Sequence, residues 1–232
     1  MELALRGSNR SSAAQQIYEQ LRQQIVALTL EPGSVLSKKE IADAFRVSQT
    51  PVREALIRLE KEGLIEIYPQ SRTVVSFIDV QSAREAHFLR VSVEVEIARS
   101  LAAKITQDEL KDLHDLIDQQ TFALKRDDLS AFTESDNQFH NRMYDIAGVR
   151  GLWDLVDSRR AHLDRLRRLH LPSKGKAKSI IRDHKAIVMA LDSGNPKEAE
   201  RAVRRHLDGT VSSTQELKSL FPEYFGSGDK AA

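Results

Sequence analysis

The stretch VSQTPVREALIRLEKEGLIEIYP, Val47 to Pro69, decides the fold of the N-terminal part of this chain. Ser48 stands where a side chain can cap a helix, and Pro51 falls in the first turn, where a missing N–H costs little. Gly63 is a residue type that ends helices. Branched and aromatic residues then lie on both sides of a turn at 69–72, which predicts a two-stranded hairpin.

Two shorter helices are expected before this one. Apolar residues recur at helical spacing over 13–30, and Ser37 with Glu40 has the spacing of a capping box for a helix that begins at Lys38. Two helices that cross steeply need apolar or small residues at their contact, and the chain supplies Ile41, Ala42, Phe45, Val47, Val52 and Ala55. Three helices and a hairpin predict a winged helix-turn-helix domain over residues 1–78.

The start of the third helix carries polar residues that the packing does not use. Ser48, Gln49, Thr50 and Arg53 are expected to point outward, and in a helix-turn-helix such residues enter the major groove. Arg72, at the tip of the hairpin, is placed to reach a phosphate or the minor groove. The alternative is that this is a solvated helix cap, with Arg53 in a surface ion pair with Glu54 or Glu60.

Composition limits the function classes. The 232 residues are 41% apolar and 30% charged, and no cysteine is present, so disulfides, thiolate metal sites and cysteine nucleophiles are excluded. A formal net charge of +1 is too small to indicate a purely structural nucleoid protein. Nothing resembles a signal peptide or a membrane span. We therefore expect a cytoplasmic protein with no membrane partner. It is expected to be nucleoid-associated only through the DNA contacts described above.

The rest of the chain has helical period almost throughout. Thr106, Gly148 and the stretches LPSKGK and SGNP interrupt it. The expected helices cover 80–104, 106–126, 128–146, 149–170, 175–193 and 196–219. The fold class is therefore mainly α, with the winged helix-turn-helix followed by an all-α antiparallel bundle of six to seven helices over 79–225, and a disordered tail at 226–232.

One carboxylate and three imidazoles are expected to converge inside this bundle. Asp136 and His140 are four residues apart on one helix and share a face. His184 and His206 lie eleven residues before and after Asn195, which places them at similar height in an antiparallel helical hairpin. These residue types suit a divalent ion, with Zn²⁺ expected first and Ni²⁺ or Mn²⁺ as alternatives. The simpler alternative is a buried polar cluster bonded around a water.

The N-terminal motifs resemble a known family. The stretch LEPGSVLSKKEIADAFRVSQTPVREALIRLEKEGLI is similar to the DNA-binding domain of GntR-family bacterial transcription regulators. The resemblance implies that Arg53 is the main base or phosphate contact, with Gln49 and Thr50 beside it. Gln49 replaces an arginine that many members have, and the wing tip Gln70-Ser71-Arg72 replaces a common glycine, so base preference and wing contact are the points where this chain departs from the pattern.

The C-terminal motifs DNQFHNRMY, RDHKAIVMAL and RRHL resemble the FCD-type effector domain of the FadR subfamily, whose metal-binding members match at all four positions above. The resemblance also implies that Arg90, in FLRVSVEVEIA, reaches a small carboxylate effector. Glu94 orients Arg90 or forms only a helix ion pair with it, and His87 lines the same pocket. The basic segment 159–185, with ten basic and two acidic side chains, is a solvated face, a subunit contact or an anion-attracting rim of that pocket.

The expected function is a homodimeric repressor that binds a palindromic operator and releases it when a carboxylate binds at the metal. One recognition helix reads only a few base pairs, so two half-sites are needed. The alternatives are a regulator that binds an acyl thioester without metal and a metal-dependent hydrolase. The hydrolase lacks an identifiable general base or nucleophile, so no catalytic residue is expected.

Overall fold

The computed structural model describes residues 12–69 and 71–226, and they form two compact units. The first contains the N-terminal residues up to Val80 together with the segment 216–226, and the second is Gln81–Gln215. The expected boundary at 78 lies close to the observed one. The segment from 216, which the sequence groups with the effector domain, is found instead in the N-terminal unit. Of the expected tail only Gly226 is described; the rest lies outside the described residues.

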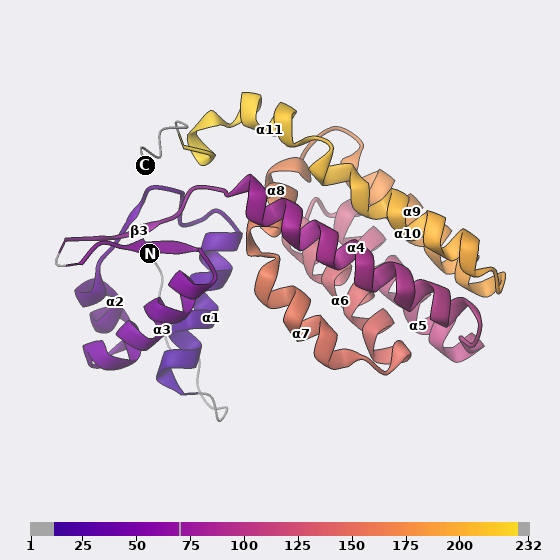
Figure 1. Ribbon diagram of the computed structural model, residues 1–232, viewed down its shortest axis with the longest axis horizontal. Coiled ribbons are helices and arrows are strands. Elements are labelled where there is room, and N and C mark those ends of the chain that lie inside the picture. Colours follow the sequence, from indigo (N-terminus) through magenta and orange to yellow (C-terminus); the bar gives the residue numbers. More distant parts are fainter. Residues whose placement is uncertain (1–11, 70, 227–232) are drawn as a thin grey trace. The chain divides into compact units, whose positions relative to one another are not determined.

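Three helices and a small sheet build the first unit (Figure 1). The helices are α1 (Ala13–Val26), α2 (Lys38–Phe45) and α3 (Gln49–Lys61). Ile17, Leu21 and Ile25 of α1 are fully buried, as their spacing predicts, and α1 packs mainly against α3. Ser37 caps α2 by accepting a hydrogen bond from the Glu40 N–H. These contacts fix α3 on the body of the unit.

The sheet has one strand more than the expected hairpin. Strands β2 (Ile65–Ile67) and β3 (Thr73–Val75) form the hairpin, and β1 (Val35–Leu36) pairs antiparallel with the other edge of β3. Two residues are too short to show an alternating pattern, so β1 has no signal in the sequence. The winged helix-turn-helix is confirmed, with a three-stranded wing.

The C-terminal segment of the first unit contains α11 (Thr214–Leu220) from Glu216 onward and the 3₁₀ turn η1 (Pro222–Tyr224). The Ile78 N–H donates to the Tyr224 carbonyl at 2.9 Å, directly after the wing. Leu217 is 1% exposed, and the backbone of Gly226 lies against the Phe77 ring. The end of the chain is thus part of the N-terminal unit.

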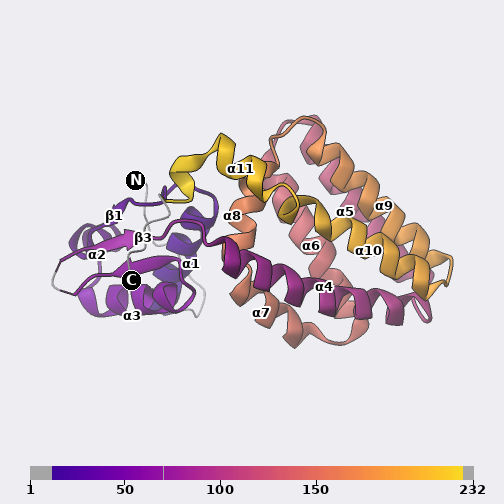
Figure 2. The ribbon, with the colours of Figure 1, turned by 45° about the horizontal axis from the view of Figure 1, so that its top comes forward.

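Seven helices form the second unit. The long ones are α4 (Val80–Ala102), α5 (Gln107–Lys125), α6 (Leu129–Ala147), α9 (Lys176–Asp192) and α10 (Pro196–Val211), and the short ones are α7 (Arg150–Arg159) and α8 (Ala161–His170). Helix α5 packs against α6 and α9, and α9 packs against α10 (Figure 2). The all-α bundle is confirmed. This packing brings α4, α6, α9 and α10 around one interior.

Two of the expected helices are each divided in two. The helix expected over 149–170 breaks at Arg160, whose guanidinium is held by Asp157 at 2.7 Å and Asn137 at 2.9 Å. The helix expected over 196–219 breaks after Val211, where the Ser212 hydroxyl bonds back to the Asp208 carbonyl. The break at Arg160 starts a new helix, α8, which forms one wall of the pocket described below.

Candidate metal centre and DNA-reading helix

Helix α3 presents its N-terminal polar residues on the surface. Ser48, Gln49, Thr50 and Arg53 are all exposed. On the opposite face Val52, Ala55 and Leu56 are fully buried. The apolar face therefore anchors the helix and leaves the four polar side chains available for contact, as the sequence predicts.

Arg53 does not form the ion pair with Glu54 or Glu60 that was the alternative. Within residues 12–69 and 71–226 no ion pair or hydrogen bond of its side chain is found. Ser48 occupies the N-cap position of α3, but its side chain makes no capping hydrogen bond. The side chains of Arg53 and Ser48 are thus available to contact another molecule.

Arg72 is exposed beside the turn between β2 and β3, and its guanidinium lies 5.4 Å from the centroid of the Tyr68 ring. The Tyr68 N–H donates to the Arg72 carbonyl at 2.8 Å, which closes the turn. Gln70, part of the expected wing tip, lies outside the described residues. Of the residues expected at the wing tip, the structure therefore describes Ser71 and Arg72, both exposed.

In the second unit the four expected metal ligands converge. Asp136 and His140 come from α6, His184 from α9 and His206 from α10, and one donor atom of each lies within 4.8 Å of all the others. The His206 Nε2 lies 3.1 Å from the His140 Nε2 and 3.2 Å from the His184 Nε2. Three of the four, Asp136, His140 and His184, are each at most 1% exposed. Helix spacing thus brings the four side chains together as predicted.

The outer nitrogens of two histidines have fixed partners. The His140 Nδ1 lies 2.9 Å from the Glu94 Oε2, and the His184 Nδ1 lies 2.9 Å from the Gln120 Oε1. Gln120 also donates to Asp136 at 3.3 Å. Partners of this kind place the proton on Nδ1 and turn the Nε2 lone pair inward, as in metal-binding histidines.

This arrangement tests whether the residues fit a metal ion. Two inward lone pairs, of His140 and His184, both face the Nε2 of His206, and a single proton there can satisfy only one of them. A divalent cation at the centre accepts all three nitrogens and the Asp136 carboxylate at once. One carboxylate with three imidazoles is a donor set typical of Zn²⁺ and neighbouring transition metals. The residues fit a metal ion.

Burial and neighbouring charges set the protonation states of the four side chains. Burial lowers the pKa of His140 and His206, and lowers that of His184 to about 3, so the imidazoles are neutral near pH 7. Burial alone would raise the pKa of Asp136, but Arg167 and the histidines outweigh it and hold that pKa well below its usual range. The cluster therefore offers neutral nitrogens and an ionised carboxylate.

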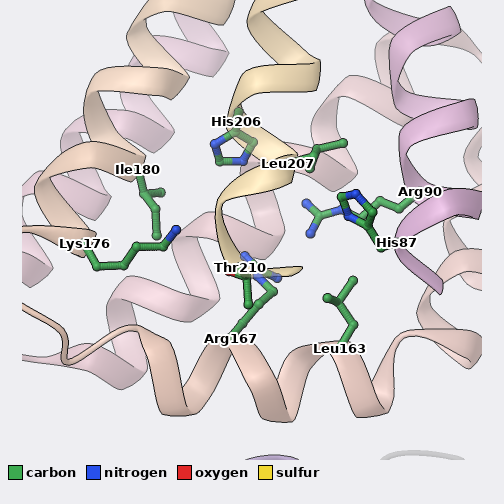
Figure 3. Close-up of a pocket in the computed structure, with 9 residues that line it drawn as sticks. All are labelled: His87, Arg90, Leu163, Arg167, Lys176, Ile180, His206, Leu207 and Thr210. Atoms are coloured by element: carbon green, nitrogen blue, oxygen red, sulfur yellow. The ribbon is translucent and has the colours of Figure 1, made fainter. Parts of the chain in front are cut away.

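A pocket opens beside the cluster (Figure 3). His206 is a wall of the pocket as well as a member of the cluster, and His87 and Arg90 project into it from α4. The Arg90 Nε donates to Glu94 at 2.6 Å, and both side chains are buried. Glu94 thus contacts Arg90 and His140 at once, and these contacts outweigh its burial and bring its pKa to about 2.

The sequence interpretation missed several residues of this site. Gln120 has no signal in the sequence, because its role depends on how α5 packs against α6 and α9. The basic segment left open which arginine faces the pocket, and the structure places Arg167 there, hydrogen bonded to Asp136. The pocket also includes Lys176 and Thr210. Two histidines outside the cluster and the pocket differ in burial: His114 is exposed and His162 is buried.

Comparison with known proteins decides the family. Residues 13–75 match the pattern described as bacterial regulatory proteins, gntR family, and residues 85–209 match the FCD domain. The chain belongs to the GntR family of regulators with an FCD domain. It is a DNA-binding transcription regulator, not an enzyme.

The HTH-type transcriptional repressor RspR of Escherichia coli is 34% identical over 211 residues, which is 91% of this chain and 92% of that protein. The gluconate operon transcriptional repressor of Bacillus subtilis is 28% identical over 149 residues, 63% of this chain and 61% of that one. GntR-family relatives of this chain thus include named repressors.

Solved structures share the fold. The E. coli protein McbR/YncC has a TM-score of 0.74 at 18% identity, covering 91% of this chain and 99% of that one. A regulator from Rhodococcus sp. described as GntR has a TM-score of 0.75 at 19% identity, covering 89% and 99%. In the described part of the GntR-family chain, no helix has the length and apolar character that crossing a membrane requires.

Proposed function

We propose that this protein is a repressor whose hold on operator DNA is released when a small carboxylate binds at a metal ion in the FCD domain. The observation that carries the proposal is the convergence of Asp136, His140, His184 and His206 within 4.8 Å, directly beside the pocket that Arg90 lines. A cluster that only stabilised the bundle would not need to face a pocket. His206 belongs to both.

In this proposal the four residues hold the ion, with Zn²⁺ expected first, and Glu94 and Gln120 hold the histidine rings in place. The bound metal would supply a positive charge with an open coordination position for a ligand oxygen. Arg90 would donate to the carboxylate of the ligand from the other side, since its guanidinium is kept in place by Glu94. His87, also on α4, would line the same end of the pocket.

The character of the pocket favours a small acid over an acyl thioester. Arg90, Arg167 and Lys176 all line it, and the nine lining residues include no carboxylate. A long acyl chain would need a continuous apolar channel, whereas Leu163, Ile180 and Leu207 supply only part of the wall. The positive charge of these side chains favours an anionic ligand.

DNA binding would rest on α3. Arg53, Gln49 and Thr50 are exposed at its N-terminal end, where a recognition helix meets base edges and phosphates. Arg72 would add a contact from the wing. We propose that two copies of the chain form a homodimer that reads a palindromic operator, since one recognition helix covers too few base pairs for specific binding. Effector binding then shifts the population toward a state that fits the two half-sites poorly.

The test begins with selection of operator sequences from random duplex DNA on the metal-loaded protein. Fluorescence anisotropy then measures operator affinity with and without lactate, malate or gluconate. We expect at least one of these acids to weaken DNA binding, and expect the release to require metal and to be reduced in Arg90→Lys, which keeps the charge but loses the planar fork. Operator affinity that none of the acids alters, with metal present, would contradict the proposal.

A further inference from the structure

Three cationic side chains line the pocket, and two of them already have a carboxylate. Arg90 pairs with Glu94, and Arg167 pairs with Asp136 and with Asp164, the latter at 3.2 Å. The third, Lys176, forms no ion pair with any residue in the described ranges 12–69 and 71–226. Among the described residues, therefore, no carboxylate pairs directly with the Lys176 ammonium group.

The Lys176 side chain lies beside Gly209 of α10. Lys176 is the first residue of α9, and its side chain runs toward α10, where its ammonium group lies at the pocket (Figure 3). A Cβ atom added at Gly209 would come within 2.7 Å of the Lys176 Nζ. Glycine inside a helix lowers its stability relative to alanine. The bare backbone at 209 gives the ammonium group the room it occupies.

The surroundings of Lys176 are unfavourable for an isolated charge. Burial lowers the pKa of Lys176, and the neighbouring Arg167 lowers it further, while Asp183 and Asp136 act in the opposite direction more weakly. Lys176 also stands in the first turn of α9, where the helix dipole disfavours a cation. An anion bound in the pocket would relieve all three effects.

The pocket places this charge apart from the metal side. In Figure 3, Arg90 and Lys176 enter from opposite sides, with His206 between them, and Thr210 lies one turn after His206 on α10. Leu163, Ile180 and Leu207 are the apolar lining residues. A ligand that spans the pocket would therefore have an acidic group at each end and a short carbon chain between them.

We propose that the effector is a short dicarboxylate, with one carboxylate bound by Arg90 and the metal ion and the other by Lys176 and the Thr210 hydroxyl. This inference rests on the proposed function, because it assigns the second end of a ligand whose first end lies at the metal. It identifies Lys176 as the residue that distinguishes diacids from monoacids.

Calorimetric titration of the metal-loaded full-length protein tests this with two matched pairs, malate against lactate and succinate against propionate. We expect at least one diacid to bind about tenfold to hundredfold more tightly than its monoacid, since a charge-assisted hydrogen bond to a half-buried ammonium group has that effect. Lys176→Met should remove this difference, because the diacids should lose much more affinity than lactate and propionate. Lys178→Met, on the same helix with an exposed side chain, should keep it.

A second variant distinguishes a local effect at Lys176 from misfolding of the Lys176→Met protein. Gly209→Ala fills the space beside the Lys176 Nζ with one methyl group, so it should reduce diacid preference while α10 remains folded. Metal content, measured in each variant, should stay as in the wild type. Equal binding of diacids and monoacids by the wild type, or a diacid preference that survives in Lys176→Met, would overturn the inference while leaving the proposed function intact. Failure of all four acids to bind the metal-loaded protein would overturn the inference, and failure of gluconate as well to bind or to alter operator affinity would overturn the proposed function.

Discussion

Glu94 contacts both the cluster of Asp136 and three histidines and the pocket beside it. One of its oxygens lies 2.6 Å from the Arg90 Nε and the other 2.9 Å from the His140 Nδ1. Its sequence spacing from Arg90 indicates the first contact, because residues four apart share a helix face. The second contact depends on the packing of α4 against α6, and no sequence pattern predicts it.

Replacement of Glu94 by glutamine should therefore weaken metal binding. The amide can still accept from the His140 ring, but the negative charge that strengthens His140 as a ligand is lost, and Arg90 loses its ion-pair partner. Removal of an outer partner of this kind typically reduces metal affinity about tenfold to hundredfold. Competition with a chromophoric chelator measures it. Glu96→Gln, on the same helix with its side chain 77% exposed, should match the wild type.

Arg53 provides a prediction for DNA binding at the same scale. Arg53→Ala should weaken operator binding by about 1–3 kcal/mol and, where the contact is to a phosphate, reduce the salt dependence by about one ion. Lys61→Ala, at the other end of α3 and also exposed, is the control and should change affinity little. Equal effects of the two substitutions, measured by anisotropy over a range of salt concentrations, would contradict a special role for the start of α3.

At the scale of elements, Ser37 and Ser48, which begin α2 and α3, differ in the hydrogen bonds of their side chains. The Ser37 hydroxyl accepts from the Glu40 N–H, whereas Ser48 stands at the N-cap of α3 without a capping bond from its side chain. The sequence predicts both serines as N-caps, because residue type and spacing indicate the position of a cap. They do not indicate the side-chain rotamer that decides whether the capping hydrogen bond forms. Only the structure separates a stabilising cap from a side chain free to contact DNA.

Ser37→Ala should therefore lower the free energy of unfolding by about 1 kcal/mol and leave operator contacts unaltered. Ser48→Ala should have a smaller effect on unfolding and a larger one on DNA affinity. Chemical denaturation and anisotropy on the same two variants separate these effects. A larger loss of stability in Ser48→Ala than in Ser37→Ala would show that the assignment is reversed.

Elements with long periodic patterns were predictable, as were the interruptions marked by Thr106, Gly148 and the stretch SGNP, but the breaks at Arg160 and after Val211 were not. The break at Arg160 and the short strand β1 depend on side-chain bonds and pairing to distant residues, namely Asn137 for Arg160 and β3 for Val35 and Leu36. The convergence of the four side chains in the cluster could be predicted because each pairing rests on helix spacing or hairpin symmetry. The place of Lys176 in the pocket could not, because it depends on the packing of α9 against α10, where Gly209 has no side chain.

At the scale of the whole molecule, the chain returns to its N-terminal unit. Helix α10 carries His206 and Thr210, which line the pocket. Beyond α10, the Tyr224 carbonyl accepts a hydrogen bond from the Ile78 N–H, just after the wing. Charge and composition gave no sign of this, because the segment has no distinctive pattern.

Truncation tests what this segment contributes. A chain that ends at Gln215 loses the buried Leu217 and the partner of the Ile78 N–H, so the DNA-binding unit should unfold at a lower temperature, by about 2 kcal/mol or more in stability. A chain that ends at Gly226 keeps both and should melt like the full chain. Identical melting of the two truncated chains would show that the segment adds nothing to the unit.

The metal content of the purified protein tests the central claim most directly. Elemental analysis of the wild type is compared with His206→Ala, which removes one ligand of the cluster, and with His114→Ala, whose side chain is exposed. We expect about one divalent ion per chain in the wild type and in His114→Ala, and loss of that ion in His206→Ala. Absence of metal from all three proteins, or equal metal in all three, would contradict a metal-held effector site.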